Sequence, residues 1–250
     1  MIRGPLVESA FGSDPRFRWR SHEVNRVEAF SDAVFAFALT LLVVALEVPR
    51  TYEQLLDAVR GFPAFAACFA LLYLLWYQHY TFFRRHGIVD RFVLVWNAVL
   101  VFLVLFFVYP LKFLFSLLFG AWMLQLGWID AETSPQFAAR VQEAFDGWDP
   151  RQLMLIYSSG YLAVSIVFLL LYRHAWKLRE RLELDALERH ITVDALLAHG
   201  IDACIGILSL AIAWFGSADN AAFAGLIYAL LGPAHGLRGY LRGRRQPVRA

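Results

Sequence analysis

The chain has 250 residues, of which 59% are hydrophobic and 18% charged, with a formal net charge of +2. Soluble domains are closer to half apolar and seldom hold apolar runs as long as a bilayer is thick, so this composition excludes an ordinary soluble domain. The small net charge and the absence of basic residues interleaved with aromatic ones give no reason to expect a nucleic-acid partner.

Six runs are apolar enough to cross a bilayer as helices, which takes about 20 residues each. In chain order they cover residues 29–49, 61–83, 91–118, 152–173, 192–215 and 219–240. The sequence therefore predicts an all-α polytopic membrane protein with six transmembrane helices per subunit. We expect an N-terminal arm over residues 1–25, a six-helix domain over residues 26–240 and a basic tail over residues 241–250.

Most of the 23 basic residues lie before the first run, between the second and third, between the fourth and fifth, and after the sixth. Because cytoplasmic loops are enriched in Lys and Arg, this distribution predicts that both termini of this multi-pass protein are cytoplasmic.

The first run, RVEAFSDAVFAFALTLLVVALEVP, carries one stripe of side chains at helical spacing. Steps of three or four residues place on it Ala33, Phe37, Thr40, Val44 and Glu47. One such stripe per subunit cannot enclose a water path, but several copies around an axis can. Thr40 would then face water or an ion; the alternative is a hydrogen bond from its hydroxyl to the carbonyl of Ala36.

Asp32, at the start of this run, needs a partner because an ionised group at the edge of the hydrocarbon is costly. The candidates are Arg26 on the same helix, His79 and Gln78 on the second run, and Trp96 and Asn97 on the third. The simplest interpretation is a polar network that holds three helices together.

Residues Arg26, Phe30, Ser31 and Asp32 form the pattern R-x-x-x-F-S-D, which is followed by AVFAFALTLLVVALEVP. Together with WYQHYTFF at the end of the second run and WN in the third, this segment resembles the potassium channel transmembrane protein 175 of endosomes and lysosomes and its bacterial homologues. The resemblance covers residues 24–110, and through the bacterial homologues it implies a multi-pass protein of a bacterial inner (plasma) membrane.

The resemblance implies a homotetramer of six-helix subunits, with a central pore lined by the first helix and no carbonyl-lined filter. The narrowest ring lies five residues after the motif aspartate, at Phe37, and a hydroxyl ring follows at Thr40. Family members usually have isoleucine or leucine at the constriction, so phenylalanine is a departure that affects potassium over sodium selectivity. The implied residues are a pore lining of Ala33, Thr40, Val44 and Glu47, and a motif network of Arg26, Phe30, Ser31, Asp32, His79, Trp96 and Asn97.

The implied partners are potassium, other monovalent cations or protons, and the lipid bilayer. A proton-permeable channel, a carrier and a non-conducting membrane protein remain alternatives, although we find no internal repeat of the kind that many carriers show. No enzyme motif is present, and we expect no cofactor and no metal. In the fifth run, His199 and Asp202 share a face three residues apart and Asp194 lies nearby; they form either an interhelical hydrogen bond or a cation or proton site.

Overall fold

The computed structural model describes residues 16–21, 23–44, 48–129, 134–145, 149–217, 221–245 and 247, and every regular element in these ranges is a helix. The elements are α2 (Arg26–Val44), α3 (Tyr52–Arg60), α4 (Phe62–His86), α5 (Arg91–Gln125), α6 (Pro135–Phe145), α7 (Pro150–Lys177), α8 (Ala186–Phe215), α9 (Ala221–Leu226), the 3-10 helix η2 (Ile227–Leu230) and α10 (Leu231–Gly243).

The long helices begin where a polar side chain caps their free N–H groups. Asn25 Oδ1 accepts hydrogen bonds from the backbone N–H groups of Val27 and Glu28, both at 2.9 Å, at the start of α2. Asp90 and Asp149 cap α5 and α7 in the same way, and Asp185 forms a capping box at the start of α8. These caps satisfy orphan donors and fix where each helix starts.

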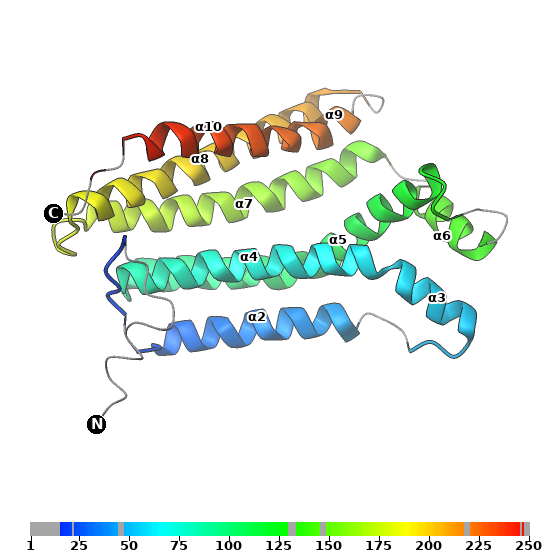
Figure 1. The fold of residues 1–250 in the computed structure, drawn as a ribbon, viewed down its shortest axis with the longest axis horizontal. Coiled ribbons are helices and arrows are strands. Elements are labelled where there is room, and N and C mark those ends of the chain that lie inside the picture. The colour runs from blue at the N-terminus through cyan, green and yellow to red at the C-terminus, as the bar shows by residue number, and fades with distance from the viewer. Residues whose placement is uncertain are drawn as a thin grey trace.

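The helices form two packed groups (Figure 1). In one group α2 packs against α4 and α5, and in the other α7 packs against α8, which is covered by α9, η2 and α10. Contacts between α5 and α7 join the groups, and α3 and α6 lie at one end of the bundle. The helix α2 lies at an edge of the bundle, with neighbours on one face.

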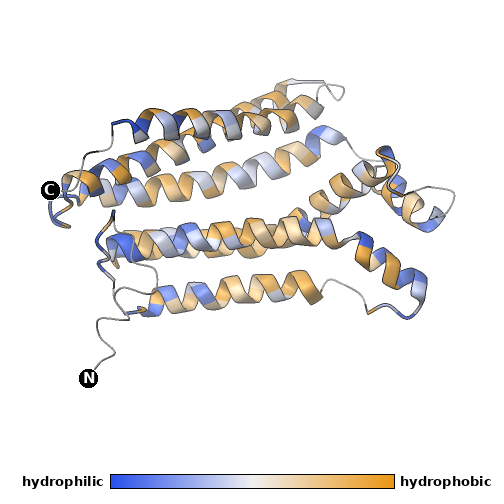
Figure 2. Ribbon diagram, viewed as in Figure 1, coloured by the Kyte–Doolittle hydropathy of each residue, from blue (hydrophilic) through white to orange (hydrophobic). Residues whose placement is uncertain are grey.

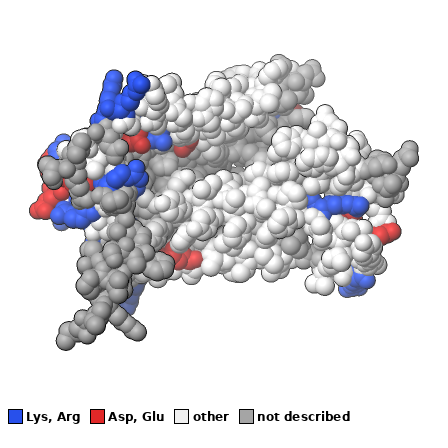
Figure 3. All heavy atoms as spheres, viewed as in Figure 1, with Lys and Arg blue, Asp and Glu red and all other residues white. Residues whose placement is uncertain are grey.

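Hydrophobic residues fill the middle of the bundle, and hydrophilic ones lie toward its ends (Figure 2). Charged side chains gather at the same two ends, leaving an uncharged band between them (Figure 3). This is the arrangement that a bilayer requires, because charged groups are costly in hydrocarbon.

The prediction of six spans is confirmed only in part. Among the described residues, α2, α5, α7 and α8 are long and apolar enough to cross a membrane, and the pair α3 and α4, bent by 43°, is a fifth candidate. The sixth predicted span, residues 219–240, is divided into α9, η2 and α10, and α10 contains His235, Arg238 and Arg242. These polar residues and the 3-10 break explain why this segment is not a candidate span.

Three polar contacts tie the bundle together at the end where α4 finishes and α8 starts. The guanidinium of Arg20 donates to the carboxylate of Glu188 at 2.6 Å, and Arg20 N–H donates to the carbonyl of Arg84 at 3.0 Å. His174, near the end of α7, lies 2.6 Å from the carboxylate of Asp90. Burial opposes ionisation of Asp90, but the hydrogen bonds from Val93 and His174 outweigh it and lower the pKa of this carboxyl.

The close crossing of α7 and α8 gives a test of the fold. A Cβ atom at Gly206 would lie 3.3 Å from Cβ and 3.4 Å from Cα of Leu162, whereas a Cβ at Gly200 meets nothing within 4 Å. Gly206→Leu should therefore destabilise the protein by about 1–3 kcal/mol through overpacking, and Gly200→Leu should not. Thermal unfolding in detergent measures both, and equal melting temperatures for the two variants would contradict this crossing.

Candidate functional site

The buried face of α2 carries a polar anchor centred on the side-chain amide of Asn97. Asn97 Nδ2 donates to Ser31 Oγ at 2.9 Å, and its Oδ1 lies 2.8 Å from Nε2 of His79. Ser31 Oγ in turn donates to the carbonyl of Val27, one turn earlier, at 2.9 Å. Ser31, Asn97 and His79 are 0%, 3% and 1% exposed, so this network joins α2, α5 and α4 away from solvent.

The chemistry of the anchor fixes the proton on His79. Because the amide oxygen of Asn97 can only accept, Nε2 of His79 is the donor, and the ring is anchored to α5 in that tautomer. The His79 ring also packs against Phe35 of α2 and Phe83 of α4, with centroids 5.8 and 4.7 Å away. The anchor therefore fixes the rotation of α2 about its own axis.

Asp32 finds a different partner from those that the sequence suggested. The indole Nε1 of Trp76 donates to Asp32 Oδ1 at 2.8 Å, and the Trp76 ring stacks on Tyr80. No ion pair joins Arg26 to Asp32 among the described contacts. Trp96 is also outside the network, because it packs partly buried against the core of α4, α5 and α7 with its ring 6.2 Å from Phe92.

Sequence reasoning missed Trp76, although a signal for it existed. Trp76 lies three residues before His79 in WYQHYTFF, so the two share a face of α4 that points toward α2. The Trp96 prediction failed because Trp96 directly precedes Asn97, and neighbouring helix positions point about 100° apart.

The face of α2 opposite the anchor is exposed and has no neighbour among the residues of the subunit that the structure describes. Phe30, Phe37 and Val44 are 60%, 55% and 75% exposed. Ala33 and Thr40, which lie between them along the helix, are exposed as well. These are the predicted stripe residues that the structure describes, together with Phe30 of the motif. Glu47, the fifth stripe residue, lies outside the described residues.

The two phenylalanines in the middle of α2 have opposite environments. Phe35 is 2% exposed and packs with Ala38, Leu42 and residues of α4 and α5, whereas Phe37 is 55% exposed. The hydroxyl of Thr40 donates to the carbonyl of Phe37 at 2.7 Å, not to that of Ala36 as the sequence suggested. Thr40 is therefore satisfied by its own helix while its side chain remains exposed.

A second polar cluster lies in the other half of the bundle. Asp202 Oδ1 accepts hydrogen bonds from Tyr161 at 3.0 Å and His235 at 2.8 Å, while His199 lies 3.5 Å from Oδ2. Asp194 pairs with Arg238 at 2.5 Å. Within the described ranges, no three His, Cys, Asp or Glu side chains are arranged to hold a metal ion.

The fold and this site define an all-helical, multi-pass membrane protein whose helix α2 is anchored on one face and exposed on the other, over the residues that the structure describes. Residues 26–108 match the family described as endosomal/lysosomal potassium channel TMEM175. A potassium channel of Marivirga tractuosa is 35% identical over 231 residues, which is 91% of this chain and 91% of that protein. One of Chamaesiphon minutus is 31% identical over 182 residues, covering 70% of this chain and 75% of that protein.

A solved structure is similar as well. The crystal structure of the potassium channel MtTMEM175, a T38A variant in complex with a nanobody fusion, matches 93% of this chain and 99% of its own, with a TM-score of 0.80 and 33% identity. The chain belongs to the TMEM175 family, which is a family of ion channels and not of enzymes.

The polar anchor gives a test by stability. Asn97→Ala leaves His79 without its acceptor and Ser31 without a donor in a buried site, which should cost about 1–3 kcal/mol. Ser159→Ala is the control, since the exposed Ser159 hydroxyl bonds only to the carbonyl of Ile156 on its own helix. Thermal unfolding in detergent should show a clearly lower melting temperature for Asn97→Ala and not for Ser159→Ala. An unchanged melting temperature for Asn97→Ala would show that these hydrogen bonds do not stabilise the bundle.

Proposed function

We propose that the chain forms a homotetrameric cation channel that conducts potassium. Its pore is lined by the exposed stripe of α2 from each subunit, and Phe37 forms the narrowest ring. The observation that carries this proposal is the contrast between the two faces of α2, which is anchored by Ser31 and Phe35 on one side and is exposed at Phe37 and Thr40 on the other. Several copies around an axis cover that face and enclose a path at the same time.

The relatives support potassium as the permeating ion. The proteins of Marivirga tractuosa and Chamaesiphon minutus are both named potassium channels, and the first matches nearly the whole chain. Ser158–Tyr161 has the sequence SSGY, which is faintly similar to the signature loop of channels with a carbonyl-lined filter, but it lies within the continuous helix α7 and so does not support such a filter.

The stripe offers a passing cation a defined sequence of surroundings. Asp32 is partly exposed at the start of α2, and its carboxylate would raise the local concentration of cations at the pore entrance. A ring of Phe37 side chains forms an apolar constriction that controls passage by its wetting, and the aromatic faces attract a cation that has lost part of its water. Thr40 would supply a ring of hydroxyl oxygens one turn further on.

The remaining assignments belong to the same proposal. Residues 26–240 form the channel domain, between a cytoplasmic arm, residues 1–25, and a basic cytoplasmic tail, residues 241–250, in the bacterial inner membrane. Helix α10 reaches Gly243, so the channel domain would pass into the tail without a break in the helix. Closing the count at six spans requires α9, η2 and α10 to cross the membrane together.

Ion flux into liposomes tests the constriction. Purified wild-type protein should conduct potassium in preference to sodium, and Phe37→Ala should conduct several times more with a potassium-to-sodium ratio closer to one, because the ring no longer limits the pore. Phe102→Ala, a similarly exposed phenylalanine on α5, is the matched control and should behave as wild type. Potassium flux in Phe37→Ala alone would show that the Phe37 ring is a closed gate. The absence of flux in both proteins, when both are folded, would reject the proposal of a channel.

Cadmium block tests which face of α2 lines the pore. Thr40→Cys places thiols around the proposed axis, where Cd²⁺ binds several thiolates at once and should block most of the potassium flux. Ala38→Cys, on the fully buried face, and the wild type with its native Cys68 and Cys204 are the controls and should remain conducting. Block of Ala38→Cys but not Thr40→Cys would place the pore on the other face.

A further inference from the structure

A large cavity lies between the two packed groups of helices, away from the exposed stripe of α2. Its volume is about 1300 Å³, and its walls come from α4 and α5 on one side and from α7, α8, α9, η2 and α10 on the other. Figure 3 shows the surface hollowed between the two groups, with uncharged walls over most of its length. This volume exceeds the roughly 300–1,000 Å³ of most small-molecule pockets.

The wall on the α4 and α5 side is elongated and mostly apolar, with Gln78 and Arg85 as its polar members. On α5 the lining runs from Leu103 to Leu118, and fifteen residues of helix rise about 22 Å. Leu71, Leu72 and Leu75 continue the apolar wall on α4. An apolar space of this shape beside a bilayer is poorly suited to water and runs parallel to lipid acyl chains, which gain dispersion contacts by filling it.

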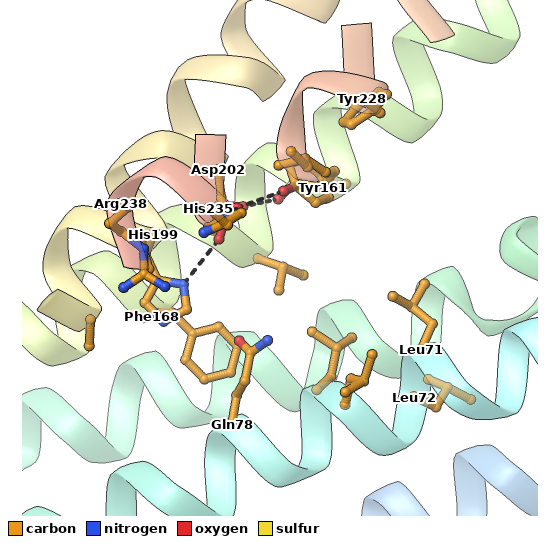
Figure 4. A pocket seen from close by; sticks show the side chains of 18 of the residues that line it. Leu71, Leu72, Gln78, Tyr161, Phe168, His199, Asp202, Tyr228, His235 and Arg238 are labelled. Carbon is orange, nitrogen blue, oxygen red and sulfur yellow. Dashed lines mark hydrogen bonds and ion pairs between the residues drawn. The ribbon is translucent and has the colours of Figure 1, made fainter. Parts of the chain in front are cut away.

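The facing wall is polar, and its Asp202 carboxylate is already satisfied. The buried Tyr228 hydroxyl and the Nε atoms of Arg238 and Arg242 have no hydrogen-bond partner among the described residues. Figure 4 shows Asp202 with Tyr161, His199 and His235 on this wall, opposite Leu71 and Leu72. The Asp202 carboxylate accepts hydrogen bonds from Tyr161 and His235 and lies close to His199. It therefore does not need a further hydrogen-bond donor from the cavity. A hydrocarbon chain can therefore lie along the leucines without unpairing a charge.

One end of the cavity is basic. Arg238 and Arg242 share a single carboxylate, that of Asp194, at 2.5 and 3.7 Å. Over the whole lining, the charged side chains are four arginines, Arg16, Arg85, Arg238 and Arg242, and two aspartates, Asp194 and Asp202. Arg238 and Arg242 thus outnumber their one shared carboxylate at the end where α8 begins and α10 finishes, which the positive-inside rule assigns to the cytoplasm.

We propose that this cavity is a binding site for a membrane phospholipid with an anionic headgroup, whose acyl chains lie along α4 and α5 and whose phosphate lies at the Arg238 and Arg242 end. Basic pockets between membrane helices on the cytoplasmic side are known to hold anionic headgroups, and arginine binds phosphate through charge-assisted hydrogen bonds. The lipid would fill the space between the two groups of helices and add contacts to both. The proposal does not depend on ion conduction.

Lipid retention measured by native mass spectrometry tests this site. The detergent-purified protein is mixed with phosphatidylglycerol or phosphatidylcholine, and the lipids bound per subunit are counted. Wild type should retain about one phosphatidylglycerol per subunit and bind it about tenfold more tightly than phosphatidylcholine, since one charge-assisted contact is worth about that factor. Thermal unfolding of the same samples should show a higher melting temperature with phosphatidylglycerol.

Two variants separate the chains from the headgroup. Ala198→Phe, on the cavity wall, should lose both lipids, while Ala98→Phe, exposed on α5, should behave as wild type. Arg242→Gln should still bind lipid but lose the preference for phosphatidylglycerol over phosphatidylcholine. Arg173→Gln, at an exposed position of α7, is its control and should retain that preference.

Three results would overturn the proposal. The first is equal binding of phosphatidylglycerol and phosphatidylcholine by the wild type, which needs no variant to fold. The second is undiminished retention by folded Ala198→Phe. The third is full stabilisation by glycerol 3-phosphate, which would show an anion site without a place for acyl chains.

Discussion

The hydrogen bonds of the Asn97 amide determine how the first membrane helix faces the rest of the subunit. An amide buried between helices must satisfy both its donor and its acceptor, and here Ser31 and His79 are its partners. Once Ser31 points inward, helical periodicity decides the rest. Thr40 lies nine residues later, about two and a half turns, and must point the opposite way. The exposed stripe is thus a consequence of a single buried polar contact.

Hydrophobicity alone cannot choose that orientation. Phe35 and Phe37 have the same side chain and lie two residues apart near the middle of α2, yet Phe35 is buried and Phe37 is exposed. Rotating the helix by about half a turn would exchange the environments of these two phenylalanines. It would, however, leave the Asn97 Nδ2 donor without Ser31 and carry Ser31 away from α5, so the polar anchor favours the rotation in which Phe35 is buried.

The sequence predicts the long apolar helices well because spanning length and hydropathy are local properties. It also predicts the stripe, since helical spacing is local too. It fails where the answer depends on how helices face one another. Trp76 rather than Trp96 binds Asp32, and the Thr40 hydroxyl bonds to Phe37 rather than Ala36. The predicted sixth span is the other weak point, because α10 mixes apolar residues with His235 and arginines that find partners only on α8.

The layer formed by α4 and α5 packs against α2 on one side and lines the cavity on the other. Leu72 and Val104 pack in the cluster that buries Phe35, Ala38 and Leu42 of α2, and both also line the cavity on the other side. The same two side chains therefore lie between the helix proposed to line the pore and the site proposed for a lipid. Because a close-packed interior transmits small displacements rather than absorbing them, filling the cavity would limit how far Leu72 and Val104 can move away from α2. Packing against Leu72 and Val104 would then hold the rotation of α2 in addition to the hydrogen bonds of Asn97. A ring of Phe37 side chains keeps a fixed width only if that rotation is held.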